Sequence, residues 1–163
     1  NCVKDKIQRS KTIDDSTGQS SEHEARTSSG SYYACGENDY IKKIEDRISK
    51  LVNWPMEKSE GIQVLKYGIG DQYKPHYDYF NETIKLDHGG QRIGTFLMYL
   101  NTPDKGGCTS FPDAGIEIAA QRGNAIFFSY DKPDSSTKTL HAGMPVIEGE
   151  KWIATKWLRQ HKY

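Results

Sequence analysis

The stretch KWIATKWL, residues 151–158, alternates between two sets of side chains along its length. Successive side chains of an extended strand point to opposite faces, so residues two apart share a face. The first face would carry Lys151, Ile153, Thr155 and Trp157. The second face would carry Trp152, Ala154, Lys156 and Leu158. We therefore expect a β-strand here, with one face available to line the interior of a β-fold.

Short segments of the same kind recur throughout the chain after residue 60. They are rich in β-branched and aromatic residues, and Gly, Pro, Asp and Asn turns separate them. The predicted strands lie near 62–68, 73–79, 92–100, 107–111, 116–119, 124–129, 138–143 and 151–159. About eight short strands with Gly-rich turns favour a double-sheet fold such as a jelly roll. The expected fold class is α+β, mainly β, with a jelly-roll core and flanking helices.

The first third of the chain has a different character. Residues 14–31 read DDSTGQSSEHEARTSSGS, a loop composition that fits either an exposed linker or a lid over a site. Apolar residues then recur at helical spacing, at Ile41, Ile44, Ile48, Leu51 and Val52. Asn38 or Asp39 can cap this helix, and Trp54-Pro55 ends it. We expect the helix to pack on an outer face of the sheet.

Length and composition narrow the class of protein. The 163 residues fit a single domain spanning 1–163. Lys and Arg total 22, and Asp and Glu total 22, so a net charge of zero gives no electrostatic case for nucleic acid or an anionic membrane as partner. Mean hydropathy is −0.79, and no apolar run approaches the length of a membrane span. No secretion signal is recognisable at the start, but the sequence opens at Asn1, so it is expected to be trimmed.

The three cysteines indicate no framework of their own. Cys2, Cys35 and Cys108 are odd in number and widely spaced, and they form no Cys-x-x-Cys zinc pattern. One pair could still form, but small buried or partly exposed thiols are the simpler expectation.

A metal site is indicated by YKPHYDY, residues 73–79. If this segment is a strand, His76 and Asp78 project side by side from one face. An imidazole and a carboxylate that face inward cost free energy unless something pairs with them, and a metal ion would do so. The pattern His-x-Asp is common, however, and by itself is compatible with an ordinary structural pair.

A third ligand must come from elsewhere in the chain. Of the five histidines, His23 lies in the polar loop, His88 in a turn-like setting and His161 near the end. His141 lies in a strand-like run and is the best candidate. Two histidines and one carboxylate leave three positions of an octahedron open, which suits Fe(II) that binds a chelating co-substrate and O2. A zinc hydrolase with the same ligands stays open as an alternative.

Lys151 favours the Fe(II) site with a chelating co-substrate over the zinc hydrolase. It shares its predicted face with aromatic and β-branched residues, so a position inside the fold would require an anion beside it. The distal carboxylate of 2-oxoglutarate would serve. The alternative is a surface lysine whose ammonium group stays in water.

Seven segments, in order along the chain, resemble the catalytic domain of the prolyl 4-hydroxylases in the 2-oxoglutarate/Fe(II) dioxygenase superfamily. They are RTSSG at 26–30, YKPHYD at 73–78, the run 92–101 that ends in MYLN, GGCTSFP at 106–112, RGNA at 122–125, HAGMPV at 141–146 and GEKW at 149–152. The resemblance implies a double-stranded β-helix (jelly-roll) core. It also implies a procollagen-proline 4-dioxygenase type of activity, which hydroxylates proline in a peptide while 2-oxoglutarate is converted to succinate and CO2.

The resemblance further implies a role for each matching residue. The expected iron ligands are His76, Asp78 and His141. The expected contacts to 2-oxoglutarate are Lys151, Tyr67 and Thr109. The residues expected near the peptide are Arg92 and Trp157, together with a loop at 26–30 that closes over it. Cys108 stands at a variable position, so no catalytic role is expected for it. The strand and helix that usually precede the Arg-Thr-Ser segment look shortened here.

The expected cofactors and partners follow from the same resemblance. They are Fe(II), O2, 2-oxoglutarate as co-substrate, ascorbate as a further small-molecule ligand, and a proline-containing peptide or protein. Two rivals remain: a hydroxylase of another side chain or of a small molecule, and a jelly-roll binding module without catalysis. The sequence defines no oligomeric state. The expected compartment depends on the source, cytoplasm for a microbial or viral chain and endoplasmic reticulum lumen for a plant- or animal-like secretory enzyme.

Overall fold

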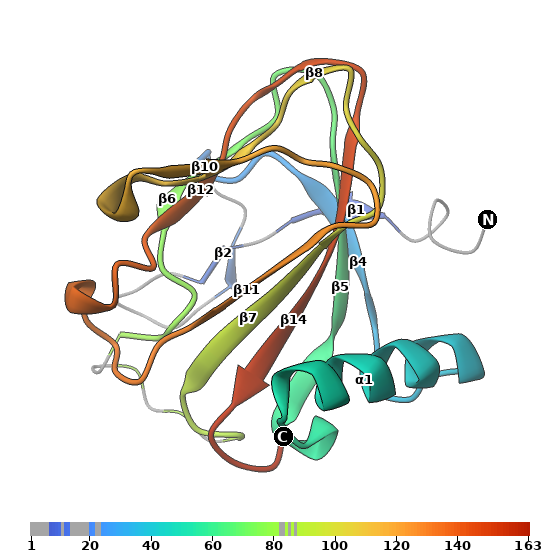
Figure 1. Ribbon diagram of the computed structural model, residues 1–163, viewed down its shortest axis with the longest axis vertical. Helices are drawn as coiled ribbons and strands as arrows, with labels where there is room; N and C mark the ends of the chain where they lie inside the picture. Colours follow the sequence, from blue (N-terminus) through green and yellow to red (C-terminus); the bar gives the residue numbers. More distant parts are fainter. Residues whose placement is uncertain are drawn as a thin grey trace.

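The computed structural model describes residues 7–10, 12–13, 20–21, 24–81, 84, 86 and 88–163. It consists mainly of antiparallel strands, with a helix on one outer face (Figure 1). The larger sheet contains, in spatial order, β1 (Gln8–Arg9), β4 (Ser29–Tyr33), β5 (Ser59–Tyr67), β14 (Lys151–Arg159), β7 (Arg92–Tyr99) and β11 (Ala125–Ser129). The smaller sheet contains β10 (Ile116–Ile118), β9 (Thr109–Phe111), β12 (His141–Gly143) and β6 (Tyr73–His76).

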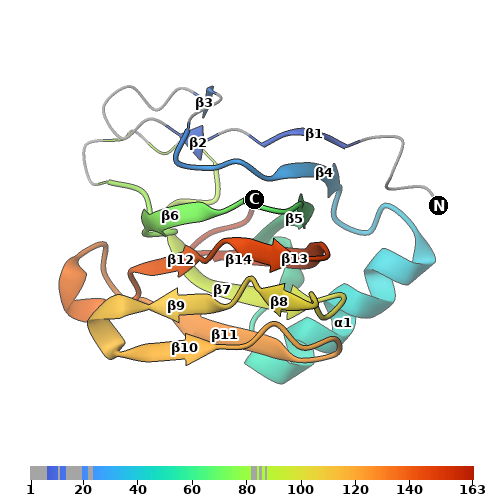
Figure 2. The ribbon, with the colours of Figure 1, turned by 90° about the horizontal axis from the view of Figure 1, so that it is seen from above.

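These two sheets face one another across the core, as the view from above shows (Figure 2). Two short ribbons complete the described strands, β8 (Lys105–Gly106) with β13 (Val146–Glu148) and β2 (Thr12–Ile13) with β3 (Ser20–Ser21). Short 3-10 helices occupy Met56–Lys58, Pro112–Ala114 and Ser135–Thr137. The arrangement confirms the predicted jelly-roll fold.

Helix α1 (Asp39–Val52) covers the outer face of the larger sheet (Figure 1). The Asn38 side chain accepts hydrogen bonds from the first helical N–H groups, and Asn53 closes the helix in the left-handed conformation. The helix buries an apolar stripe against the sheet, in a cluster made of Ile41, Ile62, Val64 and Ala154. The predicted helix and its packing are therefore confirmed. No helix in the described part of the chain has the length and apolar character to span a bilayer.

The interior between the sheets receives the other face of the same strands. Its apolar cluster consists of Leu65, Tyr67, Leu97, Tyr99, Ala120, Val146 and Ile153. The alternation of β14 predicted from the sequence is confirmed, because Ile153 belongs to this inner cluster and Ala154 to the helix-facing one. The inner face of β14 therefore points toward the smaller sheet, and polar residues on that face lie inside the fold.

The predicted loop over 14–31 contains strand residues in its described part, although 24–28 lie outside the named strands. β3 occupies Ser20–Ser21, and β4 begins at Ser29 and pairs with β5. Main-chain pairing to an existing strand needs no apolar pattern, so composition alone missed β4. Gly30 permits this pairing, since a Cβ there would lie 2.7 Å from the Val64 carbonyl oxygen. The remainder of the loop prediction, at 14–19 and 22–23, lies outside the described residues, as do Cys2 and His23.

Candidate active site

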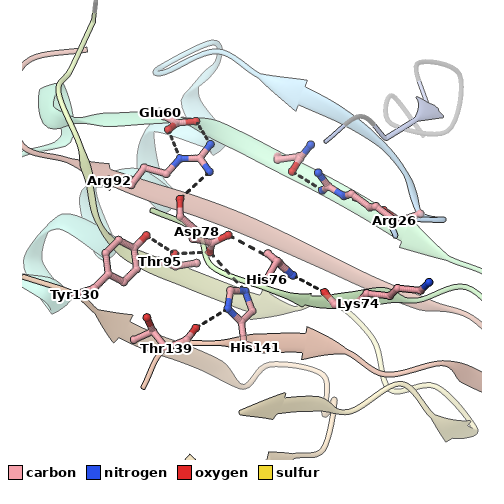
Figure 3. Close-up of polar contacts among 12 residues, drawn as sticks. Arg26, Glu60, Lys74, His76, Asp78, Arg92, Thr95, Tyr130, Thr139 and His141 are labelled. Atoms are coloured by element: carbon pink, nitrogen blue, oxygen red, sulfur yellow. Dashed lines mark hydrogen bonds and ion pairs between the residues drawn. The ribbon is translucent and has the colours of Figure 1, made fainter. Parts of the chain in front are cut away.

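Three side chains that could hold a metal ion converge between the sheets (Figure 3). His76 ends β6 and His141 begins β12, and the two residues are directly opposed in this antiparallel pair. Opposed residues project to the same face, so their imidazole centroids lie 4.2 Å apart. Asp78 follows two residues after His76. Its Oδ1 lies 3.7 Å from His76 Nε2, and its Oδ2 lies 3.6 Å from His141 Nε2.

The strand that carries His76 is shorter than predicted. We expected one strand over 73–79, but β6 ends at His76 and Asp78 lies in the bend that follows. The reason is that His141, the partner of His76, is the first residue of β12, so no paired strand continues beyond it. Asp78 nevertheless reaches the two imidazoles, which means that the prediction of their proximity holds although its geometric reason was wrong.

The hydrogen bonds of both histidines leave Nε2 free to bind a metal. His76 Nδ1 lies 2.8 Å from the main-chain oxygen of Lys74, and His141 Nδ1 lies 3.0 Å from that of Thr139 (Figure 3). A carbonyl oxygen only accepts, so each Nδ1 carries the hydrogen and each Nε2 presents a lone pair. One ligand atom from each of the three residues lies within 4.8 Å of the others. Lone pairs gathered in this way repel one another unless a cation binds between them, so the donor set fits a metal ion.

The electrostatic surroundings keep His76 and Asp78 in the protonation states that bind metals. Burial and repulsion from His141 lower the pKa of His76 to about 3, so the ring is neutral at pH 7. Burial alone would raise the pKa of Asp78. The neighbouring imidazoles, the Arg92 guanidinium and a hydrogen bond from Thr95 outweigh it and lower this pKa to about 2. Neutral imidazole and ionised carboxylate are the forms that bind divalent metals.

Lys151 lies in the same pocket and is 1% exposed. Its Nζ donates to the Gly107 carbonyl oxygen at 3.0 Å and lies 4.5 Å from the centre of the Tyr67 ring. No carboxylate of the described residues pairs with it, and burial lowers its pKa to about 8. A buried ammonium group without an anion is costly, so this end of the pocket is built to receive one.

The pocket brings most of the predicted site residues together. The triad, Lys151, Tyr67, Thr109 and Trp157 all line it. The Tyr99 hydroxyl donates to Thr109 Oγ1 at 2.7 Å, which leaves the hydroxyl hydrogen of Thr109 available to a ligand. Thr155 Oγ1 and Trp157 Nε1 are buried without a hydrogen-bond partner among the described residues. Such groups are rare in folded proteins and mark places where a ligand or water completes the structure.

Arg92 is the predicted site residue that does not line the pocket. It lies behind Asp78, where its guanidinium group donates to both carboxylate oxygens of Glu60, at 2.6 and 2.9 Å. Nη1 also donates to the main-chain oxygen of Asp78 at 3.3 Å (Figure 3). The guanidinium carbon lies 3.9 Å from the centre of the Trp157 ring. Arg92 therefore connects the predicted peptide side of the pocket with the main chain of a metal ligand.

Several residues beside the triad were not found from the sequence. Thr95 contacts the Asp78 carboxylate directly, and Tyr130 contacts Thr95. Glu60 pairs with Arg92. Arg26, predicted only as part of a loop, is buried against the Tyr73 ring at 4.8 Å and donates to the Gln63 side chain. The available signal for Thr95 was a polar residue in an apolar strand, which on its own does not distinguish a site from a satisfied hydroxyl. The Arg26–Tyr73 contact depends on tertiary structure alone.

The sequence also matches a known family. The sequence model of the 2OG-Fe(II) oxygenase superfamily matches residues 62–159, which include the triad and Lys151. The chain belongs to this superfamily.

Proteins similar to this chain include several prolyl 4-hydroxylases. The Arabidopsis thaliana protein named "Probable prolyl 4-hydroxylase 10" is 40% identical over 182 residues, covering 99% of this chain and 63% of the relative. The chain thus spans less than two thirds of that relative's length.

The viral collagen prolyl hydroxylase of Paramecium Bursaria Chlorella virus-1, solved with 2OG, is 33% identical over 83% of this chain and 80% of that one, with a TM-score of 0.71. A prolyl hydroxylase from Trichoplax adhaerens, solved with a peptide fragment, shares the fold at 17% identity over 91% of this chain and 70% of that one, with a TM-score of 0.63. The resemblance seen in the sequence is confirmed.

Proposed function

We propose that this chain hydroxylates proline in a peptide or protein, using Fe(II), O2 and 2-oxoglutarate. The observation that carries the proposal is the presence, in one pocket, of a two-histidine, one-carboxylate metal site and an unpaired buried lysine. The metal site alone fits several reactions. A fixed cation at the other end of the pocket adds a requirement for an anionic co-substrate, which hydrolysis by a metal-bound water does not need.

The residues divide the binding of 2-oxoglutarate between them. His76, Asp78 and His141 would hold the metal, and a site with three protein ligands would leave room for a chelating co-substrate and O2. Lys151 binds the distal carboxylate, and the hydroxyl groups of Thr109 and Tyr67 donate to the same end of the molecule. A charge-assisted bond to a buried ammonium group fixes the co-substrate in one orientation. A bound iron would supply the redox chemistry, in which one oxygen atom of O2 enters succinate as 2-oxoglutarate loses CO2 and the other converts a C–H bond of the substrate to C–OH.

The substrate side of the pocket suits a proline ring. Trp157 forms part of the pocket wall, with Arg92 packed on its ring. Tyr77 and Tyr79, which lie beside Asp78 in sequence but outside the pocket lining, stack with ring centroids 4.7 Å apart and could form an aromatic surface next to the pocket. Aromatic faces pack well on a saturated ring. The relatives named as prolyl hydroxylases, one of them solved with a peptide, support a proline-containing peptide as the substrate.

The test is turnover with Fe(II), 2-oxoglutarate and ascorbate as reductant, on a panel of proline peptides matched with lysine peptides. We expect succinate release that requires O2 and a proline peptide, with a product heavier by one oxygen atom on proline in mass spectrometry. His76→Ala and Asp78→Ala should abolish it. Oxygen on lysine would move the function to another hydroxylase, whereas turnover under nitrogen, or no succinate with any peptide, would contradict the proposal.

A further inference from the structure

The Asp78 carboxylate is held by a chain of two hydroxyl groups (Figure 3). Thr95 Oγ1 donates to Asp78 Oδ2 at 2.7 Å, and the Tyr130 hydroxyl lies 3.1 Å from Thr95 Oγ1. Asp78 is 8% exposed, Thr95 1% and Tyr130 3%, so water does not compete for these bonds. Buried polar groups in such a chain have fixed partners.

The number of hydroxyl hydrogens determines which group donates at each step of this run of hydrogen bonds. An ionised carboxylate only accepts hydrogen bonds, so the single hydroxyl hydrogen of Thr95 must go to Asp78. Tyr130 must then donate its hydrogen to a lone pair of Thr95 Oγ1. Burial raises the pKa of Tyr130, which keeps that hydrogen in place. The chain therefore runs Tyr130 to Thr95 to Asp78, with no alternative arrangement of hydrogens.

These hydrogen bonds distinguish the two carboxylate oxygens of Asp78, which are otherwise nearly equivalent. Oδ1 lies 3.7 Å from His76 Nε2 and Oδ2 lies 3.6 Å from His141 Nε2, so these distances would allow either oxygen, or both, to bind a metal. The bond from Thr95 engages Oδ2 alone. Arg92 Nη1 also donates to the main-chain oxygen of the same residue at 3.3 Å, which helps to fix the backbone that carries the carboxylate. Oδ1 is left as the oxygen with both lone pairs unengaged by this chain.

We propose that Thr95, oriented by Tyr130, is a positioning residue that makes Asp78 a ligand through Oδ1 only. This inference rests on the proposed function and deepens it. A carboxylate that binds through both oxygens occupies two positions of an octahedron, so together with two histidines it leaves two open. A chelating 2-oxoglutarate would then fill both, and none would remain for O2. The Thr95 hydroxyl keeps the third position open.

The test uses Co(II) and Mn(II) as metal probes on the purified chain, without turnover. Thr95→Val removes the hydroxyl group at nearly constant volume, Thr95→Ser retains it, and Tyr130→Phe removes one oxygen atom. Ser59→Ala is the control, since Ser59 is also buried but its hydroxyl group donates to the Met56 main-chain oxygen and the residue does not line the pocket. The Kd for Co(II) is measured by titration. The water molecules on bound Mn(II) are counted from spectral broadening in ¹⁷O-labelled water.

We expect Thr95→Val to weaken Co(II) binding about 10- to 100-fold, as is usual for loss of a partner of a metal ligand. It should also lose one Mn(II)-bound water relative to the wild type. Thr95→Ser and the control should match the wild type, and Tyr130→Phe should show a smaller loss of the same kind. Thr95→Val with unchanged affinity and water count would overturn the inference. If that variant does not fold, unchanged values for Tyr130→Phe would overturn it.

The outcomes separate this inference from the proposed function. Metal binding that depends on Thr95 in a chain that never releases succinate would support the positioning role and contradict the function. Normal turnover by a Thr95→Val variant with an unchanged water count would support the proposed function and contradict the positioning role.

Discussion

Strand β14 carries two buried lysines that point to opposite faces, and the fold treats them differently. Lys156 faces α1, is 0% exposed, and forms an ion pair with Glu45 at 2.5 Å. Lys151 faces the interior between the sheets and is 1% exposed. Its Nζ donates to the Gly107 carbonyl oxygen and lies over the Tyr67 ring, and it has no carboxylate partner in the described part of the chain.

The difference shows how a structural charge can be distinguished from a functional one. Burying a charge costs several kcal/mol unless an opposite charge compensates it. The fold supplies that compensation for Lys156 through the helix. For Lys151 it supplies a pocket that also contains three metal-ligating side chains. Burial and residue type are the same at the two positions, so the missing carboxylate partner is what marks Lys151 as the lysine that we expect to bind a ligand.

The largest effect is expected from removing the structural lysine. Lys156→Met leaves Glu45 buried without its partner, which should lower the free energy of unfolding by about 3–5 kcal/mol. Urea denaturation at neutral pH measures it. The affinity for 2-oxoglutarate should stay at the wild-type value, because the change lies on the other side of the sheet.

The double variant Glu45→Gln with Lys156→Met is the control for this experiment. It removes the uncompensated carboxylate, so most of the lost stability should return. A single Lys156→Met variant as stable as the wild type would mean that the ion pair does not hold α1 on the sheet.

A smaller effect, on a different property, is expected at Lys151. Lys151→Met should raise the KM for 2-oxoglutarate about 100-fold, since it removes a charge-assisted bond in a buried site. Succinate release at varied 2-oxoglutarate measures it. Stability should be unchanged or higher, because an uncompensated buried charge has been removed. An unchanged KM would remove Lys151 from the co-substrate site.

The pH dependence of 2-oxoglutarate binding should show the smallest effect. Burial lowers the pKa of Lys151 to about 8 in the free protein. Below this pH the ammonium form binds the carboxylate, and the Kd is constant. Above it the lysine must first gain a proton, so the Kd should rise about tenfold per pH unit. Calorimetry on the Mn(II)-loaded protein on both sides of pH 8 measures it. A Lys151→Arg variant should lose the dependence, because a guanidinium group stays charged.

The sequence predicted those parts of the site that depend on local spacing. Alternation along 151–158 placed Lys151 and Trp157 on the inner face, and the structure confirms it. The two-residue separation of His76 and Asp78 brought them together even though β6 ends early. In contrast, the partners of Lys156 and Asp78 could not be predicted. Glu45 and Thr95 come from a helix and a strand whose contacts exist only after folding.

The same limit applied to the fold. Most strands after residue 60 were predicted, whereas β8, β13 and the strands β1 to β4 of the first third were not. β4 is Ser- and Gly-rich and is defined by its pairing with β5. Arg92 was predicted through family resemblance near the peptide, but its pairing with Glu60 depends on residues 32 positions apart.

The central claim is that the triad and Lys151 form one binding site for 2-oxoglutarate. The most direct measurement is calorimetric titration of the wild type and of Lys151→Met with 2-oxoglutarate, with and without Mn(II), in the absence of O2. We predict that tight binding requires both the metal and Lys151, and that the removal of either weakens it at least tenfold. Equally tight binding without Mn(II), or by Lys151→Met, would contradict the account.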